Sequence, residues 1–481
     1  MKENSGRADG LCMKGTAMSK KAWEIELNTM KNSVPVILKE EEQGWNYAEQ
    51  LERVENENTR MRWESHVPGS YATEHVIIAA MQDMENMGYD VSEAEALIEE
   101  GEKLRAADDV SALCGITARV MYVLMSSPKI PEHPHWRYTV YESFGQHAAK
   151  VSFPVWSRAD CEKDLEKKTL WGWQGQIVGG AIGTAIEGYT TDNIRKAFGE
   201  VRGYVRKPNT YNDDITYELA LLKAVEKKGR AVTAADIAEQ WVALIPMGWS
   251  AEDIALQNLK LGVFPPESGY RNNPYREWIG AQMRGAVCGM LYPGKPGEAA
   301  RLAWTDGQIS HHNNGILGEV FNAVLTSIAY VVPDIRRTVE TAISLIPDDS
   351  EYYSVISFAL AQCRKYPSWE EAWRVCEKKY ERYNWIHAYP NAAAEVIALW
   401  YGAGDFDETM HICAMEGYDV DCNAAQIGTV VAISSGKAPA EHWLEPIGDE
   451  LITYMRGNAS MSIRQLSLDT VRLSRIMNEE Q

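Results

Sequence analysis

Residues 175–188 read GQIVGGAIGTAIEG, a run in which half of the residues are glycine or alanine. The spacing of four between Gly175, Gly179 and Gly183 places these glycines on one face of a helix. Because glycine has no side chain, a second helix can approach that face closely. The run contains neither the Gly-Lys-Ser/Thr of a phosphate-binding loop nor a dinucleotide fingerprint after a strand. It therefore predicts close helix packing.

Helical patterns continue on both sides of this run, and strand-like alternation is rare. Downstream they recur with short connectors, which predicts a mainly α-helical catalytic domain over about residues 166–460 and a charged tail over 461–481. Upstream, residues 21–165 predict a smaller helical domain, which could cover the pocket, bind a target protein or form an oligomer. Residues 1–20 are polar, and we expect a disordered leader there.

Charge and composition argue against several classes of function. The chain has 481 residues, of which 48 are basic and 68 acidic, for a formal charge of −20. Such a surface repels phosphate backbones and anionic lipids, which argues against nucleic acid and membranes as partners. No uncharged apolar run approaches the roughly 20 residues of a membrane span. Eight scattered cysteines without CxxC pairs predict a reducing, cytoplasmic compartment.

Glu187 lies at the end of the small-residue helix predicted above. The helix dipole disfavours an acid at that end, so an acid kept there is a candidate general base or substrate contact. An ordinary surface glutamate is the alternative. We take Glu187 as a candidate catalytic residue.

Two further acidic motifs flank predicted helices. Asn212-Asp213-Asp214 opens the next helical pattern, and adjacent carboxylates in a pocket either raise one pKa or recruit a cation. An ordinary N-cap followed by an exposed acid is the alternative. Asp419 and Asp421, in GYDVDCN (417–423), precede thirteen residues without a charge. Acids beside such a buried helix are paired or metal-bound, because an unpaired buried charge is costly.

Together the two motifs predict a metal site. All of the donors are oxygens, which favours Mg²⁺, with Mn²⁺ as the alternative ion, over zinc. Four carboxylates suit two divalent ions, and a two-metal site can generate hydroxide and hold a substrate diol.

Residues 306–315 read DGQISHHNNG, a density of polar side chains with few structural explanations. We expect Asp306 to be a further metal ligand or to orient water. A capped turn between two helices is the alternative. A Ser-His-Asp triad lacks its usual G-x-S-x-G elbow.

From Trp171 to Gly436, these motifs in this order resemble the ADP-ribosylglycohydrolase family, whose members remove ADP-ribose from modified targets. The family's G-x-x-x-G-D-A-x-G-x-x-x-E-G helix corresponds to residues 175–188, with Gly180 in place of the aspartate. Its Thr/Ser-Asp-Asp-Thr motif corresponds to 212–215, and its G-x-D-x-D-(T/C)-N-x-A motif to 417–425. A bacterial branch adds matches at Gly280–Arg284, Pro293-Gly294, the block Asp306–Glu319, and Trp385, His387 and Pro390-Asn391.

The resemblance implies an orthogonal all-helical domain with two Mg²⁺ ions between the Asp-Asp and D-x-D motifs. The ions would bind the ribose hydroxyls and a water that attacks the anomeric carbon, breaking an N- or O-glycosidic bond. The implied catalytic residues are Glu187, Asp214 and Asp421. The implied metal ligands are Asn212, Asp213, Asp214, Asp419, Asp421 and Cys422. The implied substrate-binding residues are Asp306, Ser310, His311, Asn314, Gly315, His387 and Asn391.

Departures from the family pattern bear on the metal site and the substrate. Asn212 can supply an amide oxygen, Ile215 cannot ligate, and Cys422 is a poor magnesium ligand where the family often has threonine. The expected substrate is an ADP-ribosylated target or a small molecule. The alternatives are a nucleoside-type or other small glycoside without ADP, and a binding protein that has lost catalysis. An oligomer is left open.

Overall fold

A computed structural model describes residues 21–45 and 47–479, so the leader expected at 1–20 lies outside the described residues. The chain divides into two compact units, Met1–Glu55 and Asn56–Gln481. We call the second the main unit. In the first unit, helix α1 (Ala22–Asn32) and the short 3₁₀ helix η1 (Glu40–Glu42) bury none of their residues.

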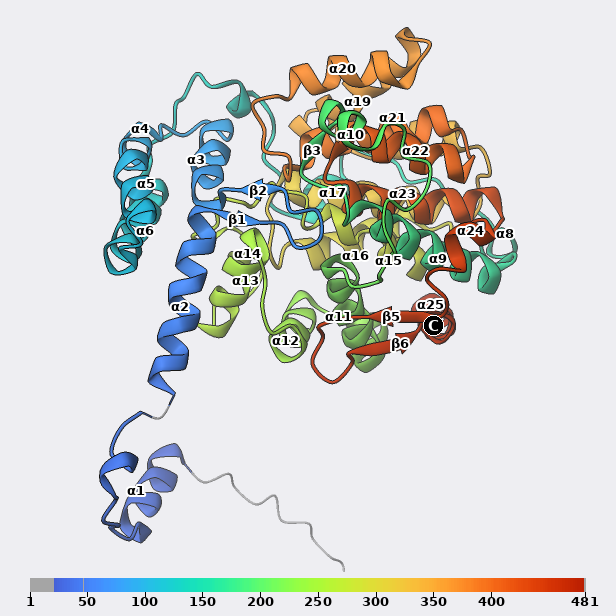
Figure 1. Cartoon of the computed structure of the whole chain (residues 1–481). Helices are drawn as coiled ribbons and strands as arrows, with labels where there is room; N and C mark the ends of the chain where they lie inside the picture. Colours follow the sequence, from blue (N-terminus) through green and yellow to red (C-terminus); the bar gives the residue numbers. More distant parts are fainter. Residues whose placement is uncertain (1–20, 46, 480–481) are drawn as a thin grey trace, which may run out of the picture. The chain divides into compact units, whose positions relative to one another are not determined.

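The fold is mainly α-helical, as predicted, with three small antiparallel sheets of two strands each in the described chain (Figure 1). The sheets pair β1 (Ser65–His66) with β2 (Thr73–Glu74), β3 (Tyr189–Thr190) with β4 (Gly417–Tyr418), and β5 (Glu450–Ile452) with β6 (Ser460–Ser462). The remaining helices are α2 (Ala48–Trp63), α3 (Val76–Asn86), α4 (Ser92–Glu95), α5 (Ile98–Ala106), α6 (Val110–Ser126), η2 (Pro134–Arg137), α7 (Phe144–Ala148), α8 (Arg158–Glu162), α9 (Leu165–Gly183), α10 (Thr191–Phe198), α11 (Asp213–Lys228), η3 (Gly229–Ala231), α12 (Ala234–Leu244), α13 (Ser250–Lys260), α14 (Glu267–Tyr270), η4 (Gln282–Arg284), α15 (Ala286–Leu291), α16 (Pro296–Gly307), α17 (Asn314–Ala329), α18 (Ile335–Ile343), α19 (Glu351–Lys365), α20 (Trp369–Lys379), α21 (Ala388–Gly402), α22 (Phe406–Glu416), α23 (Val420–Ser435), α24 (Glu441–Leu444) and α25 (Ile463–Asn478).

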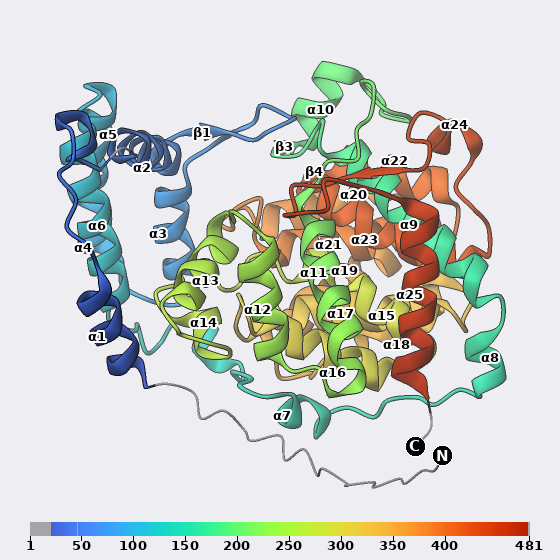
Figure 2. The same ribbon diagram turned by 90° about the horizontal axis from the view of Figure 1, so that it is seen from below.

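Helices α9 and α23 lie side by side in the main unit, and glycines of α9 set their separation (Figure 2). A Cβ atom at Gly175 would lie 2.4 Å from the carbonyl oxygen of Gly428, and one at Gly179 would lie 2.1 Å from that of Ala424. At Gly183 it would lie 2.0 Å from the backbone nitrogen of Asp421. The close packing predicted from the glycine spacing is confirmed, and it places the end of α9 against the start of α23.

The helices α3 and α6 pack against the downstream part of the chain. Their apolar faces share a hydrophobic cluster with Trp63 and with Ala251, Tyr275 and Trp278 from the downstream part of the chain. The chain divides between Glu55 and Asn56, and the domain boundary predicted near residue 165 stays a prediction. Helices α3 and α6 have too little apolar surface for a core of their own, so they share a core with the downstream part of the chain.

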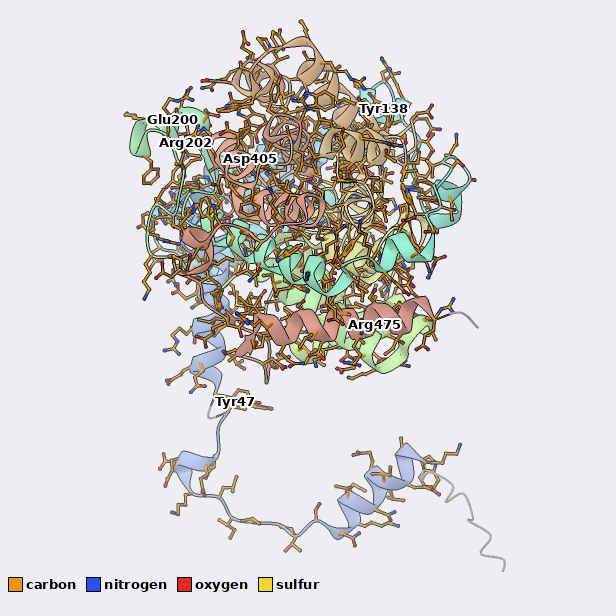
Figure 3. All side chains as sticks on the ribbon, turned by 90° about the vertical axis from the view of Figure 1, so that its right-hand side faces the viewer. Tyr47, Tyr138, Glu200, Arg202, Asp405 and Arg475 are labelled. Atoms are coloured by element: carbon orange, nitrogen blue, oxygen red, sulfur yellow. The ribbon has the colours of Figure 1, made fainter. Side chains whose placement is uncertain are left out.

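The end of the chain is a packed helix rather than the expected charged tail. One face of α25 is buried against α9 and α15, where Trp173 donates to the hydroxyl of Thr470 (3.0 Å). Its charged side chains lie on the outer face, where Arg475 pairs with Glu166 of α9 at 2.9 Å (Figure 3). The charge visible in the sequence thus belongs to the solvent face of an amphipathic helix.

Candidate metal centre

Five carboxylates from three distant segments converge in the main unit. Glu187 follows α9, Asp213 and Asp214 begin α11, and Asp419 and Asp421 lie at the start of α23. We call these five residues the acidic site. Two of the three segments are helix N-termini, where the backbone favours negative charge.

The position of Glu187 differs from the prediction. Helix α9 ends at Gly183, and Glu187 lies in the following turn, where its N–H donates to the Gly183 carbonyl (2.9 Å). Next to it, Gly188 has a φ of +79° and donates to the carbonyl of Tyr418 (2.8 Å). The pairing of β3 with β4 extends this contact. A small sheet, rather than a helix end, therefore brings Glu187 to the D-x-D motif.

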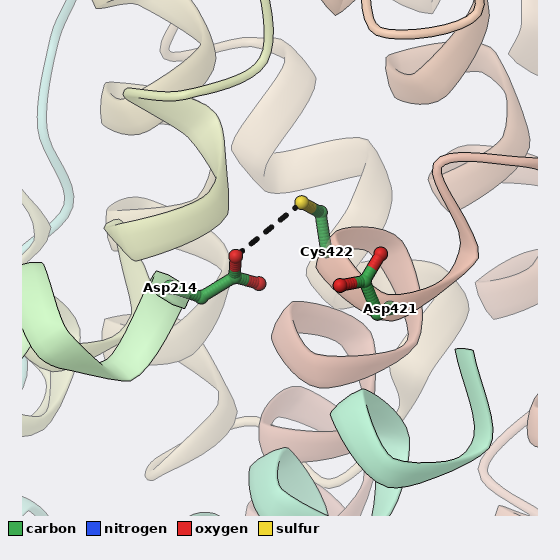
Figure 4. A group of neighbouring side chains, drawn as sticks. All are labelled: Asp214, Asp421 and Cys422. Atoms are coloured by element: carbon green, nitrogen blue, oxygen red, sulfur yellow. Dashed lines mark hydrogen bonds between the residues drawn. The ribbon is translucent and has the colours of Figure 1, made fainter. Parts of the chain in front are cut away.

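The acidic site contains two groups of ligand atoms. Asp214, Asp421 and Cys422 form one group, and Glu187, Asp419 and Asp421 form the other. Within each group, one atom from each residue lies within 4.8 Å of the others. Figure 4 shows the first group, in which the Cys422 thiol donates to Oδ1 of Asp214 at 3.5 Å. Asp421 belongs to both groups.

Burial and mutual repulsion raise the pKa of four acids in this site. Loss of solvent, followed by the neighbouring charge of Asp421, raises the pKa of Glu187, Asp214 and Asp419 well above their usual range. The same two causes raise the pKa of Asp213, the most exposed member of the site, to about 6. Protonation or a bound cation would relieve this repulsion.

The donor set fits a hard divalent cation. Asp214 Oδ2, Asp419 Oδ1 and Asp421 Oδ1 are buried carboxylate oxygens with no hydrogen-bond partner within the described protein. Unpartnered buried oxygens of this kind are costly, and oxygen donors are the ligands that Mg²⁺ and Mn²⁺ prefer. Asp214, Asp419, Asp421 and Glu187 are thus the residues that could hold metal.

Three of the expected ligands have other roles or positions. The amide oxygen of Asn212 caps α11 by accepting from the Asp214 N–H (2.7 Å), and its NH₂ group donates to Asp421 Oδ2 (3.2 Å). Asn212 therefore holds Asp421 instead of offering a free oxygen. Burial and nearby acids raise the pKa of the Cys422 thiol well above its usual range, so it stays a thiol, which is a poor ligand for Mg²⁺. Asp213 belongs to neither group of ligand atoms.

Asp306 and Ser310 of the polar block at 306–315 contact a buried arginine. Arg284, 1% exposed, donates to Asp306 and to the Ser310 hydroxyl (3.0 Å), and lies 3.3 Å from Glu252. Ser310 in turn bonds His311 at 2.8 Å. A buried guanidinium needs such acceptors. Asp306, Ser310 and His311 thus have protein partners in this structure, and their contact with substrate stays a prediction.

The other four expected substrate contacts are also buried among protein groups. Asn314 donates to the carboxylate of Glu277 at 3.1 and 3.2 Å. A Cβ at Gly315 would lie 2.4 Å from the Arg276 carbonyl oxygen. His387 faces Asp83, which the sequence did not single out. Among these four, Asn391 reaches the acidic site, because its amide oxygen accepts from the Asp419 N–H (3.2 Å).

The affinity for Mg²⁺ should fall as the pH is lowered from 8 to 6. Metal ligands must be deprotonated, and the raised pKa values keep protons on the metal-free site up to higher pH. Because these pKa values are higher in the fold than in the unfolded chain, protonation favours the metal-free fold. This stabilisation is fully present below the ordinary pKa of a carboxylate, and it is lost as the pH rises through the raised values.

Calorimetry at several pH values would measure the affinity and the protons released. Thermal unfolding in EDTA should show a lower melting temperature at pH 8 than at pH 5, with recovery at pH 8 on adding Mg²⁺. An affinity independent of pH between 6 and 8 would contradict this account of the site.

Two further properties of the described chain concern its cysteines and its helices. The seven cysteines that the structure describes are free thiols. None of the helices in that part of the chain is both long enough and apolar enough for a membrane span.

The family model for ADP-ribosylglycohydrolase matches residues 162–472. An uncharacterized protein of Archaeoglobus fulgidus is 24% identical over 295 residues, which cover 57% of this chain and 90% of the relative. A solved ADP-ribosylglycohydrolase-related protein complex is 19% identical, covering 66% of this chain and 99% of that one, with a TM-score of 0.44. Because the family model covers more than half of the sequence, the chain belongs to the ADP-ribosylglycohydrolase family.

Proposed function

We propose that this protein is a metal-dependent hydrolase that cleaves an N- or O-glycosidic bond to ADP-ribose or a related ribosyl group. Family membership supports glycoside hydrolysis in general. The observation that carries the finer proposal is the acidic site, in which three buried carboxylate oxygens lack partners within the described protein. Such a site is costly to the fold when its acids are charged and no cation is bound, because its members repel one another.

The residues of the site divide the work by position. Asp214, Asp419, Asp421 and Glu187 would hold divalent ions, Mg²⁺ or Mn²⁺, which when bound stabilise negative charge and acidify a coordinated water. A glutamate whose pKa is raised by burial and by Asp421 is suited to accept a proton, and Glu187 is such a residue. Asp213, at the exposed edge, faces the solvent from which substrate enters.

The charge of the site also suits the reaction. Cleavage of a ribosyl bond passes through a positively charged, oxocarbenium-like transition state. Carboxylates fixed by helix starts and by Asn212 are oriented before the reaction, so they stabilise that charge without reorganising.

A substrate panel tests the proposal directly. The purified full chain is incubated with ADP-ribosyl-arginine, ADP-ribosyl-serine and unmodified nucleosides, each with Mg²⁺ and with EDTA. We expect release of free ADP-ribose in Mg²⁺ and none in EDTA, because the acids cannot act together without a cation. Cleavage of nucleosides alone would favour a hydrolase of small glycosides without ADP. Metal binding without cleavage of any compound would favour a binding protein.

A further inference from the structure

The segment from β1 to α3 lies outside the family match, yet it contacts the surroundings of the acidic site. The loop between β1 and β2 lies against the turn that carries Glu187 (Figure 1). Arg206 donates to the carbonyls of both Gly69 (2.6 Å) and Thr184 (3.2 Å), and the Tyr189 hydroxyl donates to the Ser70 carbonyl (3.1 Å). These contacts place residues of the upstream segment next to the turn that carries Glu187.

A second contact is a buried carboxylate–imidazole pair between α3 and the start of α21. Asp83 and His387 are each 1% exposed, and Oδ1 of Asp83 lies 3.2 Å from Nε2 of His387. Nδ1 of His387 accepts a hydrogen bond from the Tyr389 N–H (3.1 Å), which assigns the ring proton to Nε2, the nitrogen that lies 3.2 Å from Asp83. Glu277 and Arg276 are the other charged groups near this carboxylate.

His387 connects this pair to the metal centre through Asn391. The amide nitrogen of Asn391 donates to the carbonyls of Trp385 (2.7 Å) and His387 (2.9 Å). Its amide oxygen accepts from the Asp419 N–H (3.2 Å) and from the Asn423 side chain (2.8 Å). Both donors and both acceptor positions of the amide are used, so its orientation is fixed.

The contact to Asp419 matters because of how α23 begins. Asp419 is the N-cap residue of α23, but its side chain makes no capping hydrogen bond, unlike that of Asp405 at the start of α22. The carboxylate of Asp419 is thus left free to face Glu187 and Asp421. Its backbone is held instead by Asn391.

Docking of α3 does not require the charge of Asp83. Apolar residues of α3 already pack in the cluster with Trp278, and Gln82 and Asn86 donate to the Arg382 carbonyl at 2.8 and 3.1 Å. A buried carboxylate is costly when its only partner is one histidine. An apolar side chain at this position would dock the helix at lower cost.

We propose that Asp83 is a positioning residue of the metal centre. It orients His387, and through His387 and Asn391 it fixes the backbone of Asp419 and the direction of its carboxylate. This inference rests on the proposed function, because the Asp419 carboxylate that Asp83 would position is one of the proposed ligands of the cation. Direct hydrogen-bond partners of metal ligands typically change metal affinity by 10- to 100-fold, and Asn391 is such a partner of Asp419.

The test compares the Mg²⁺ affinity of full-length variants by calorimetry, with Mn²⁺ binding by electron paramagnetic resonance as a second measure. Asp83→Leu should weaken binding by about 10- to 100-fold, whereas Asp83→Asn, whose amide oxygen can accept from Nε2, should recover most of the affinity. Gln82→Ala, on the same helix, removes a docking contact without a route to Asp419 and should bind as the wild type does. If Asp83→Leu does not fold, His387→Asn keeps a helix cap but cannot reach Asp83, and it should show the same loss.

Each result has a defined meaning. Equal affinities in the wild type and Asp83→Leu would overturn the assignment and leave Asp83 a docking role, whatever happens to the melting temperature. If the wild type binds Mg²⁺ but cleaves no glycoside, the proposed function fails while the affinities still decide the role of Asp83. If the wild type binds no divalent cation, the metal centre and this assignment fail together.

Discussion

Asp421→Asn should abolish the binding of divalent cations and reduce glycoside hydrolysis by about a thousandfold or more. Asp421 supplies a ligand atom to both groups of the acidic site, so its loss affects both at once. The stabilisation that a metal centre gives a transition state is several kcal/mol, and each 1.36 kcal/mol is tenfold in rate. Calorimetry with Mg²⁺ and the substrate panel measure the two effects.

The same variant should be more stable than the wild type when metal is removed. Asp421 raises the pKa of four neighbouring acids, so its neutral replacement relieves repulsion in the metal-free fold. Thermal unfolding in EDTA would show this as a higher melting temperature. Asp348→Asn, at an exposed aspartate, is the control and should change none of these quantities. Wild-type Mg²⁺ affinity in Asp421→Asn would show that the cation binds elsewhere.

Gly179→Ala should lower the free energy of unfolding by about 3 kcal/mol, the upper end of what overpacking a core costs. The added methyl would lie 2.1 Å from the carbonyl oxygen of Ala424, and a backbone atom cannot swing aside as a side chain can. Any relief must move α23, and with it Asp419 and Asp421. Urea denaturation measures the stability, and Mg²⁺ calorimetry of the folded fraction measures the displacement.

Gly115→Ala is the matched control for this substitution. Gly115 lies inside α6, and a Cβ there would meet nothing within 4 Å. Replacing an exposed helical glycine by alanine stabilises a protein by about 0.5–1 kcal/mol. Should Gly179→Ala be as stable as the wild type, the close crossing of α9 and α23 would be wrong.

The features that the sequence predicted are those encoded by short-range patterns. The spacing of Gly175, Gly179 and Gly183 is a property of one helix face, and it correctly indicated a close neighbour. The helix start at Asp213 follows from local capping by Asn212, and the acids Asp419 and Asp421 were expected beside a buried helix. Their convergence was inferred because isolated acids beside an uncharged helix need a shared cation.

The features that the sequence missed depend on distant partners. A polar block such as 306–315 looks alike whether its partner is a substrate or a buried Arg284 from another segment. Glu187 lies in a turn set by the pairing of β3 with β4, which are more than 220 residues apart. The role of Asp83 depends on His387, and no local signal marks that pair.

The hydrophobic cluster shared by Trp63, α3, Tyr275 and Trp278 has a consequence for anyone shortening this protein. A fragment trimmed to residues 162–472 would expose Tyr275 and Trp278 to solvent, creating an apolar surface prone to aggregation. It would also end α25 before its last turns. A fragment that does not aggregate should begin at or before Ala48, so that α2 stays whole, and should end beyond Asn478.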